Sequence, residues 1–151
     1  MQSGVNRKER KMSTEQNKAT ANRIPLEVFN MKNIALLDQL VAPNAIDHVV
    51  PPGMPETVES TKKFIGMLLA AFPDFQYTLE EVIAEGDYVV QRVTGAGTMK
   101  GEMMGMPPNG KKATWSEIHI VRLANGKVAE HWGVVDQMGM LTQLGFIPPA
   151  R

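Results

Sequence analysis

Residues 105–145 decide the fold, and they read GMPPNGKKATWSEIHIVRLANGKVAEHWGVVDQMGMLTQLG. Two strand-like runs, residues 113–123 and 127–135, lie on either side of Asn125-Gly126, a dipeptide that favours a tight hairpin turn. The stretch holds two of the three histidines and both tryptophans of the chain. A wall that mixes apolar and polar side chains is typical of a pocket for a small organic ligand, and we expect a carbonyl compound.

Alternation along the hairpin sorts its side chains onto two faces. The side chains expected on the first face are Trp115, Glu117, His119 and, on the second strand, His131. The opposite face carries apolar residues too, among them Trp132 and Val134. If one face of the sheet were exposed to solvent, apolar and polar residues would alternate more regularly along its strands. We therefore expect a second copy of the chain to cover the opposite face, with Trp132 and Val134 as anchors of a homodimer or higher homo-oligomer.

The rest of the sequence predicts helices before strands. Helical spacing runs over residues 19–40, with a break at 30–33, and again over 58–72, where Thr57 is suited to cap the helix. The remaining predicted elements are a short strand at 45–50, strands at 76–84 and 88–99, a loop at 101–111 and a last helical segment at 136–144. The run Gly95-Ala96-Gly97 is interpreted as a bend or bulge that curves the sheet. This order predicts the α+β class, with about three helices packed on one face of a curved, mainly antiparallel sheet.

Length and charge indicate the class of protein. The 151 residues suit one domain with room for a core and a cavity. Sixteen basic and sixteen acidic side chains cancel, which disfavours nucleic acid or an anionic membrane as a partner. The chain has no cysteine and no apolar run near the roughly 18 residues of a membrane span, so we expect a cytoplasmic protein. Residues 1–17 are polar and aperiodic, and we expect a disordered extension before a single domain at 18–151, with Met12 as a candidate start site.

Methionine is frequent, with 11 in the chain. Four of these residues lie close together near the predicted loop: Met99, Met103, Met104 and Met106. Because methionine is unbranched and adaptable, such a group serves either as filler of an irregular core or as a deformable wall of a ligand cavity. Both interpretations stay open at this point.

Several short motifs occur in an order that is typical of one family. They are Ala71-Phe72-Pro73-Asp74, Ala84-Glu85-Gly86-Asp87, GMPPNGK at residues 105–111, Asn125-Gly126-Lys127, Glu130-His131-Trp132 and Gln143-Leu144-Gly145. Their order and spacing resemble the SnoaL-like polyketide cyclases, often called ester cyclases, of the NTF2-like superfamily, over roughly residues 19–147. The resemblance implies a cone-shaped fold, in which a strongly curved sheet wraps around a pocket that helices close, and it implies homodimers or higher oligomers.

The resemblance also implies a reaction. It is the intramolecular aldol ring closure of a polyketide methyl ester without metal or cofactor, in which an aspartate is the acid and base and a histidine and an amide orient the substrate. The family's aspartate falls at Gly133, its histidine at His119 and its amide at Glu117, and Asp47 falls at a further polar pocket position. Either Glu117 or Asp47 has taken over proton transfer, or the pocket binds its ligand without this reaction.

The residues themselves support a candidate site. A carboxylate in an apolar pocket becomes a better base near neutral pH, and a neighbouring donor can stabilise an oxygen that gains charge. The candidate catalytic residues are Glu117, His119, Asp47 and Asp136, and the candidate substrate-binding residues are His48, His131, Trp115, Phe64, Met99, Met103, Met104 and Met106. The histidines at 48, 119 and 131 lack the local spacing of a zinc site, so we expect no metal.

Structural roles compete with several of these assignments. Asp136 is suited to cap the helix that follows it. For Glu117 the alternative is an ion pair with a nearby cation: Lys111, Lys112 or Arg122. The alternatives for the other side chains are a surface position for His48, a hydrogen-bonded sheet position for His131 and a place in the core for Trp115.

Two classes of function therefore stay open. The first is an enzyme that performs cofactor-free acid/base chemistry on a small carbonyl or polyketide ester substrate, with aldol cyclisation as the preferred reaction. The second is a non-catalytic small-molecule-binding dimer, which Gly133 favours. Other reactions of NTF2-like proteins, namely isomerisation, hydration and epoxide hydrolysis, are further alternatives that the sequence does not separate.

Overall fold

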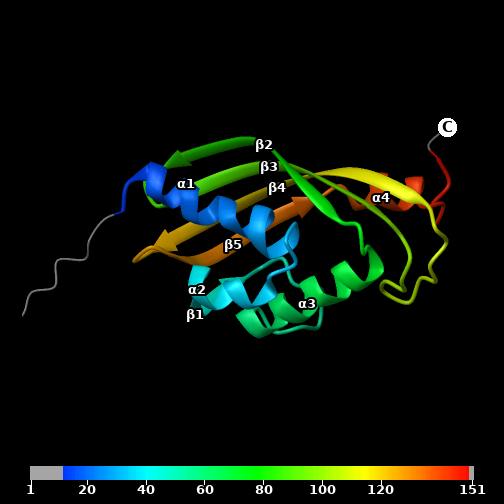
Figure 1. Ribbon diagram of the computed structural model, residues 1–151, viewed down its shortest axis with the longest axis horizontal. Coiled ribbons are helices and arrows are strands. Elements are labelled where there is room, and N and C mark those ends of the chain that lie inside the picture. The colour runs from blue at the N-terminus through cyan, green and yellow to red at the C-terminus, as the bar shows by residue number, and fades with distance from the viewer. Residues whose placement is uncertain (1–11, 150–151) are drawn as a thin grey trace, which may run out of the picture.

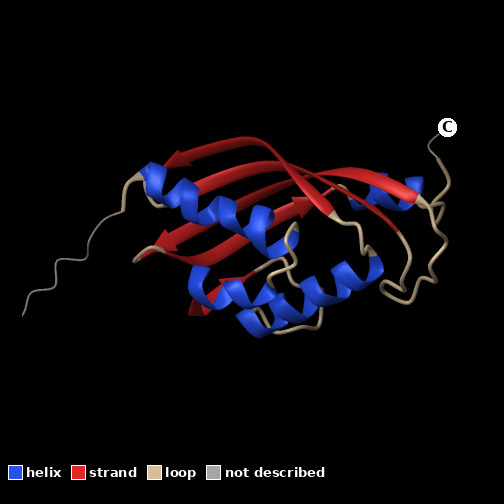
Figure 2. Ribbon diagram, in the orientation of Figure 1, coloured by secondary structure: helices blue, strands red, loops and turns tan. Residues whose placement is uncertain are grey.

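Figures 1 and 2 show helices on one face of a curved sheet in the computed structural model, which describes residues 12–149. The strands are β1 (Val41–Asp47), β2 (Gln76–Glu85), β3 (Tyr88–Thr98), β4 (Lys112–Ala124) and β5 (Lys127–Val135), and they lie in the order β1-β5-β4-β3-β2. The helices are α1 (Thr14–Arg23), α2 (Leu37–Leu40), α3 (Val58–Ala71) and α4 (Gln137–Gln143). The predicted α+β class is confirmed.

Helix α1 begins earlier than the apolar pattern predicts. Ser13 accepts a hydrogen bond from the backbone N–H of Gln16, and the Gln16 side chain bonds back to the Ser13 N–H. This capping box starts the helix before its first apolar residue. The expectation of disorder through residue 17 is therefore wrong for residues 14–17, and residues 1–11, which it also covered, lie outside the described residues.

Pro25 changes the helix that follows α1. It has no N–H to donate, and the chain forms a π-helical segment η1 (Ile24–Phe29), after which the Asn30 N–H bonds to the Pro25 carbonyl at 3.2 Å. The predicted break in the helical spacing, at residues 30–33, follows η1. The Asn30 side chain then makes two hydrogen bonds with the backbone of Tyr77, which tie the break to the start of β2. A short 3₁₀ turn, η2 (Ile34–Leu36), leads into α2.

Strand β1 lies earlier in the sequence than the predicted strand at 45–50. Ala42-Pro43-Asn44, which precede the predicted strand at 45–50, belong to β1, because an edge strand tolerates a proline. β1 pairs in parallel with β5, and Asp47 stands opposite His131. The pattern of helices followed by an antiparallel meander does not predict this parallel pair. It brings the end of β1 to the hairpin.

The other four strands form the predicted antiparallel meander. Of the bend or bulge expected at Gly95-Ala96-Gly97, the bulge is wrong, because β3 pairs with β4 there without a register shift. A Cβ at Gly95 would lie 2.9 Å from the Trp115 indole, and one at Gly97 would lie 3.0 Å from the Phe72 side chain. These glycines therefore allow two aromatic side chains to lie directly against the strand.

One irregularity in the hairpin changes the predicted faces. The ladder pairs Arg122 with Glu130 but Leu123 with Val128, so β5 holds one extra residue there. Val128 therefore faces inward and is buried, whereas strict alternation places it outward. His131 follows the bulge and keeps the predicted face.

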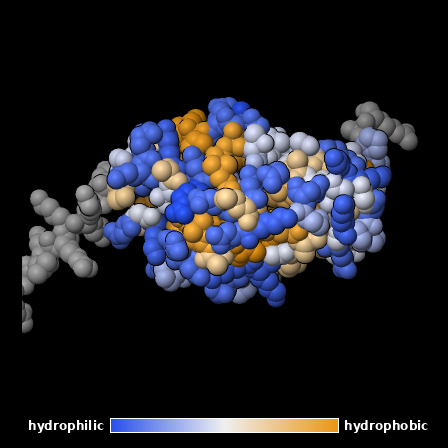
Figure 3. All heavy atoms as spheres, viewed as in Figure 1, coloured by the Kyte–Doolittle hydropathy of each residue, from blue (hydrophilic) through white to orange (hydrophobic). Residues whose placement is uncertain are grey.

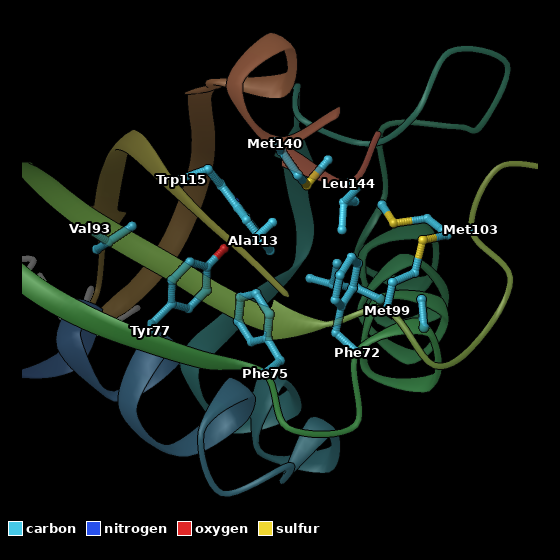
Figure 4. Close-up of a cluster of buried hydrophobic side chains, with 12 residues drawn as sticks. Phe72, Phe75, Tyr77, Val93, Met99, Met103, Ala113, Trp115, Met140 and Leu144 are labelled. Atoms are coloured by element: carbon cyan, nitrogen blue, oxygen red, sulfur yellow. The ribbon is translucent and has the colours of Figure 1, made fainter. Parts of the chain in front are cut away.

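The core beside the sheet is rich in aromatic residues and methionine (Figure 4). Phe72, Phe75 and Tyr77 lie in a row, with Trp115 and Met140 across from them. Figure 3 shows that hydrophobic side chains also reach the surface in patches among polar ones. Within residues 12–149, no helix combines the length and the apolar character needed to cross a membrane.

Candidate functional site

A cavity of about 240 Å³ lies between the helices and the inner face of the sheet. Its walls are mainly apolar, and all five strands contribute to them. The polar side chains that line it are Asp47, Thr61, Tyr77, Gln91, Glu117, His119, His131 and Gln137. Among the described residues, neither lysine nor arginine lines it. An apolar pocket with a few converging polar groups is the usual form of a small-molecule site.

The β4–β5 hairpin places three of these groups, Glu117, His119 and His131. The inward side chains of β4 are Trp115, Glu117 and His119, as the alternation predicted. The hairpin turn has both Asn125 and Gly126 at positive φ, which suits a tight turn and sets the register. Gly133 stands opposite His119, and His131 lines the same cavity. The prediction that the hairpin brings these side chains onto one face is confirmed.

Glu117 is 5% exposed and accepts three hydrogen bonds. The donors are the Tyr77 hydroxyl at 2.7 Å, the Trp115 indole N–H at 2.6 Å and His119 Nε2 at 2.6 Å. Burial raises the pKa of Glu117, but the hydrogen bonds and the attraction of His119 outweigh burial and hold the pKa below its ordinary value. The expectation that the apolar pocket makes this carboxylate a better base near neutral pH is therefore wrong. The ion pair considered for Glu117 with Lys111, Lys112 or Arg122 is wrong, because its partners are Tyr77, Trp115 and His119, and Arg122 lies beside Glu130.

The two inward histidines connect Glu117 to a second carboxylate. Nδ1 of His119 lies 2.8 Å from Nε2 of His131, and Nδ1 of His131 lies 2.9 Å from Oδ1 of Asp47. We call these four residues, in the order Asp47, His131, His119 and Glu117, the hydrogen-bonded row. The row crosses three neighbouring strands, β1, β5 and β4, and lines one side of the cavity.

Asp47 is fixed at its end of the row by two further donors. The Thr61 hydroxyl of α3 lies 2.5 Å from Oδ2, and the Val49 N–H lies 2.9 Å from Oδ1. Burial raises the pKa of Asp47, but the bonds from His131, Thr61 and Val49 outweigh burial and lower the pKa below its ordinary value. Both ends of the row are therefore held as carboxylates near neutral pH.

Gly133 lies against the row, and geometry requires a residue without a side chain there. A Cβ at this position would lie 2.6 Å from His119 Nδ1 and 3.2 Å from the Val49 side chain. His119 is bonded at both ring nitrogens, so it cannot move aside without losing a bond. The position that the resemblance assigns to an acid is thus empty of side-chain atoms, and the contact between His119 and His131 uses the space.

Two of the predicted polar site residues, Asp136 and His48, do not reach the cavity. The exposed carboxylate of Asp136 caps α4 by accepting the Gly139 N–H at 2.9 Å, which is the structural alternative considered for it. His48 follows Asp47 and therefore points to the other face of the sheet. Its neighbours there are Glu56, Glu130 and Trp132.

The predicted apolar wall is divided between cavity and core. Phe64, Met103 and Met104 line the cavity. Met99 is fully buried, and Met106 packs against the core cluster. Trp115 serves both roles, because it is 4% exposed, belongs to the core cluster and lines the cavity.

Tyr77 and Thr61 belong to the site, but the sequence analysis did not single them out. Alternation in β2 was an available signal for Tyr77, since a buried tyrosine hydroxyl needs a polar partner. Thr61 carries no comparable signal. Its partner, Asp47, is on a different element, and only the fold brings the two together.

Comparison with known proteins agrees with this geometry. A family model described as SnoaL-like polyketide cyclase matches residues 19–144. The nogalonic acid methyl ester cyclase of Streptomyces nogalater is 27% identical over 126 residues, which are 80% of this chain and 91% of that protein. The aklanonic acid methyl ester cyclase DnrD of Streptomyces peucetius is 30% identical over 105 residues, 68% of this chain and 70% of that protein.

A solved structure leads to the same group of proteins. IdmH of Streptomyces antibioticus has a TM-score of 0.77 and 32% sequence identity to this chain, and the match covers 86% of this chain and 99% of that one. The curved sheet, the internal cavity and the family match over most of the sequence lead to one conclusion. The chain belongs to the SnoaL-like polyketide cyclase family.

Proposed function

We propose that this protein catalyses a cofactor-free intramolecular aldol ring closure of a small, uncharged carbonyl ester, with Glu117 as the base. One observation carries the proposal: a buried carboxylate lies in a mainly apolar cavity beside an imidazole and a phenol. Two relatives named as methyl ester cyclases support the choice of reaction.

An aldol closure requires removal of a proton beside a carbonyl and stabilisation of the oxygen that gains charge. Oε1 of Glu117 accepts only the Trp115 N–H, so it keeps a lone pair for the substrate proton. Burial and the neighbouring Glu117 raise the pKa of Tyr77 well above 10, so its phenol stays protonated. When Glu117 takes up the proton and loses its charge, the Tyr77 hydroxyl becomes free to donate to the enolate oxygen.

The charge of the cavity indicates the class of substrate. Two carboxylates line it, and no lysine or arginine of the described residues is present to balance an anion. Desolvating an anionic substrate next to these carboxylates is costly, so the site favours an ester over the free acid. Phe64, Met103, Met104 and Trp115 supply the apolar wall for the carbon skeleton.

Turnover of aklanonic acid methyl ester and nogalonic acid methyl ester by the purified protein tests the proposal. Glu117→Gln keeps the shape of the side chain but removes the base, so kcat should fall by about 10²- to 10⁴-fold. Glu130→Gln is the matched control, because Glu130 lies on the outer face beside His48, and its kcat should match the wild type. Unchanged turnover in both Glu117→Gln and His119→Ala would overturn the assignment.

Gly133 favours a second candidate function, a small-molecule-binding protein without catalysis. In that case calorimetry should detect binding of the methyl esters to the wild type, while no cyclised product forms. Weaker binding of the corresponding free acids would still be expected, because the charge of the cavity is the same in both functions.

We also propose that the protein is a homodimer through the outer face of the sheet. Large apolar side chains are exposed there: Ile118 at 48%, Ile120 at 36% and Val134 at 75%, with Trp132 beside them. A second copy is the simplest cover for such a face. Light scattering should give a dimer mass for the wild type and a monomer mass for Val134→Lys; a monomeric wild type would contradict the proposal.

A further inference from the structure

The hydrogen-bonded row contains more hydrogen bonds than neutral imidazoles can supply. Three bonds link its four members, at 2.9, 2.8 and 2.6 Å, and each bond requires one hydrogen atom. Two ionised carboxylates supply none, and two neutral imidazoles supply one each. The three bonds therefore require one proton more than this neutral count provides, and the row then has a net charge of −1.

The contact between the two histidines shows where the extra proton is needed. If each neutral imidazole donates to its own carboxylate, Nδ1 of His119 and Nε2 of His131 both present lone pairs, and these nitrogens lie 2.8 Å apart. The rings cannot easily turn away, because His119 is 14% and His131 23% exposed and each is bonded to a carboxylate. A proton shared between the two nitrogens removes this repulsion.

The groups around the row add no competing positive charge. Tyr77 of β2 is a neutral phenol, while Thr61 of α3 and Gln91 of β3 are uncharged. The titratable groups that face one another across the site are therefore Tyr77 and the row itself. The shared proton is the only positive charge among them, and it is balanced by the carboxylates at both ends.

Gly133 makes this arrangement possible. A Cβ at position 133 would lie 2.6 Å from the nitrogen of His119 that faces His131. A side chain at this position and the bond between His119 and His131 therefore exclude each other. The absence of a side chain at Gly133 opens the space in which the two imidazoles meet.

We propose that the hydrogen-bonded row stores one proton on the imidazole pair and takes the place of the acid that position 133 does not provide. His131 and Asp47 are positioning residues, because they act through His119. The proton count follows from the bonding alone, whereas the use of the proton in catalysis rests on the proposed function.

The proton balance of the aldol step closes with this store. Glu117 takes the proton of the substrate C–H bond, and the electron pair of that bond forms the new C–C bond through the enolate. The row then holds four protons and no net charge. One proton passes from the row to the alkoxide formed from the attacked carbonyl, and the row returns to three protons. The step needs no other proton donor or proton acceptor.

Nitrogen-15 NMR of the full-length protein, labelled in histidine, tests the proton count without any substrate. Long-range ¹H–¹⁵N correlations distinguish bare, protonated and shared ring nitrogens. At pH 7.5 we expect His119 and His131 together to carry three ring protons, with Nδ1 of His119 and Nε2 of His131 sharing one. Two singly protonated rings in the wild type would overturn the proposal.

Variants test whether Gly133 and His131 are responsible. Gly133→Ala should separate the two nitrogens and leave His119 with one ring proton, while Gly66→Ala, whose Cβ meets nothing within 4 Å, should leave the spectrum unchanged. If Gly133→Ala does not fold, His131→Phe removes the partner without adding atoms beside His119, and the same loss is expected. A shared-proton signal that persists in these variants would contradict the proposal.

The kinetic readout separates this proposal from the proposed function. If the row acts as the acid, His131→Phe should lower kcat for the methyl esters at least tenfold, change the pH profile of kcat and leave KM nearly unchanged. Three ring protons in a protein that turns over neither ester would uphold the row and overturn the reaction. Turnover of the esters by a protein whose two rings are neutral would uphold the reaction and overturn the proton store.

Discussion

The two carboxylates of the cavity receive their hydrogen bonds from different parts of the fold. Glu117 is bonded by side chains of β2 and β4, and Asp47 is bonded by α3, β5 and the backbone that follows β1. Each carboxylate is stabilised in its charged form, although it is buried. Each carboxylate has one oxygen with two donors and one oxygen with a single donor, so Glu117 is assigned as the base because it lies beside the Tyr77 phenol and the His119 imidazole.

The Tyr77 hydroxyl donates a buried hydrogen bond to Glu117, and its removal should be measurable. Tyr77→Phe removes a buried hydrogen bond to a charged acceptor, so the free energy of unfolding should fall by about 1.5–3 kcal/mol. The pKa of Glu117 should rise, because one of its donors is lost. Urea unfolding measures the first effect, with the half-exposed Tyr88→Phe as the matched control. Equal, small losses in both variants would show that the bond to Glu117 adds little.

At the scale of elements, the hairpin and the glycines of β3 determine how the wall of the cavity packs. The tight turn at Asn125-Gly126 sets the register that aligns β4 with β5. Gly95 and Gly97 allow Trp115 and Phe72 to approach the strand more closely than any side chain would permit. The Trp115 indole is thereby held where it can donate to Glu117.

Gly95→Ala tests this close approach. Its Cβ would lie 2.9 Å from the Trp115 indole, and overpacking of this kind costs about 1–3 kcal/mol. Gly66→Ala in α3 is the control, since it has open space and should instead stabilise the protein by about 0.5–1 kcal/mol. Thermal unfolding monitored by circular dichroism compares the two. A Gly95→Ala variant as stable as the wild type would contradict the packing account.

Local patterns in the sequence predict local structure well here. Alternation places Glu117, His119 and His131 on one face, and the Thr57 and Asp136 caps are both confirmed. The parallel pairing of β1 with β5 is not encoded in a local period, so the position of Asp47 beside His131 was not predictable in detail. The bulge before His131 and the role of the β3 glycines likewise depend on which neighbour packs against them.

At the scale of the whole molecule, the row links β1, β5 and β4 across the inner face of the sheet. It is therefore part of the structure as well as of the site. Asp47 and Glu117, at its ends, both have a pKa that is lowered on folding. Folding stability should consequently depend on their ionisation.

Acid should destabilise the folded protein. A group whose pKa is lowered on folding adds stability above its unfolded pKa, near 3.8 for aspartate and 4.5 for glutamate, and loses it as pH falls through the folded value. The urea midpoint should thus fall below about pH 4. In the double variant Asp47→Asn, Glu117→Gln, the urea midpoint should depend less steeply on pH in this acid range. An equally steep fall of the urea midpoint in the double variant would show that other groups cause the acid unfolding.

The central claim is that a carbonyl substrate reacts inside this cavity at Glu117. A crystal structure of Glu117→Gln with aklanonic acid methyl ester bound tests it most directly. The account predicts the ester inside the cavity, with the carbon that loses its proton about 3–3.5 Å from the side chain at position 117. An ester bound elsewhere, or a side chain at position 117 that faces solvent or a partner subunit, would contradict it.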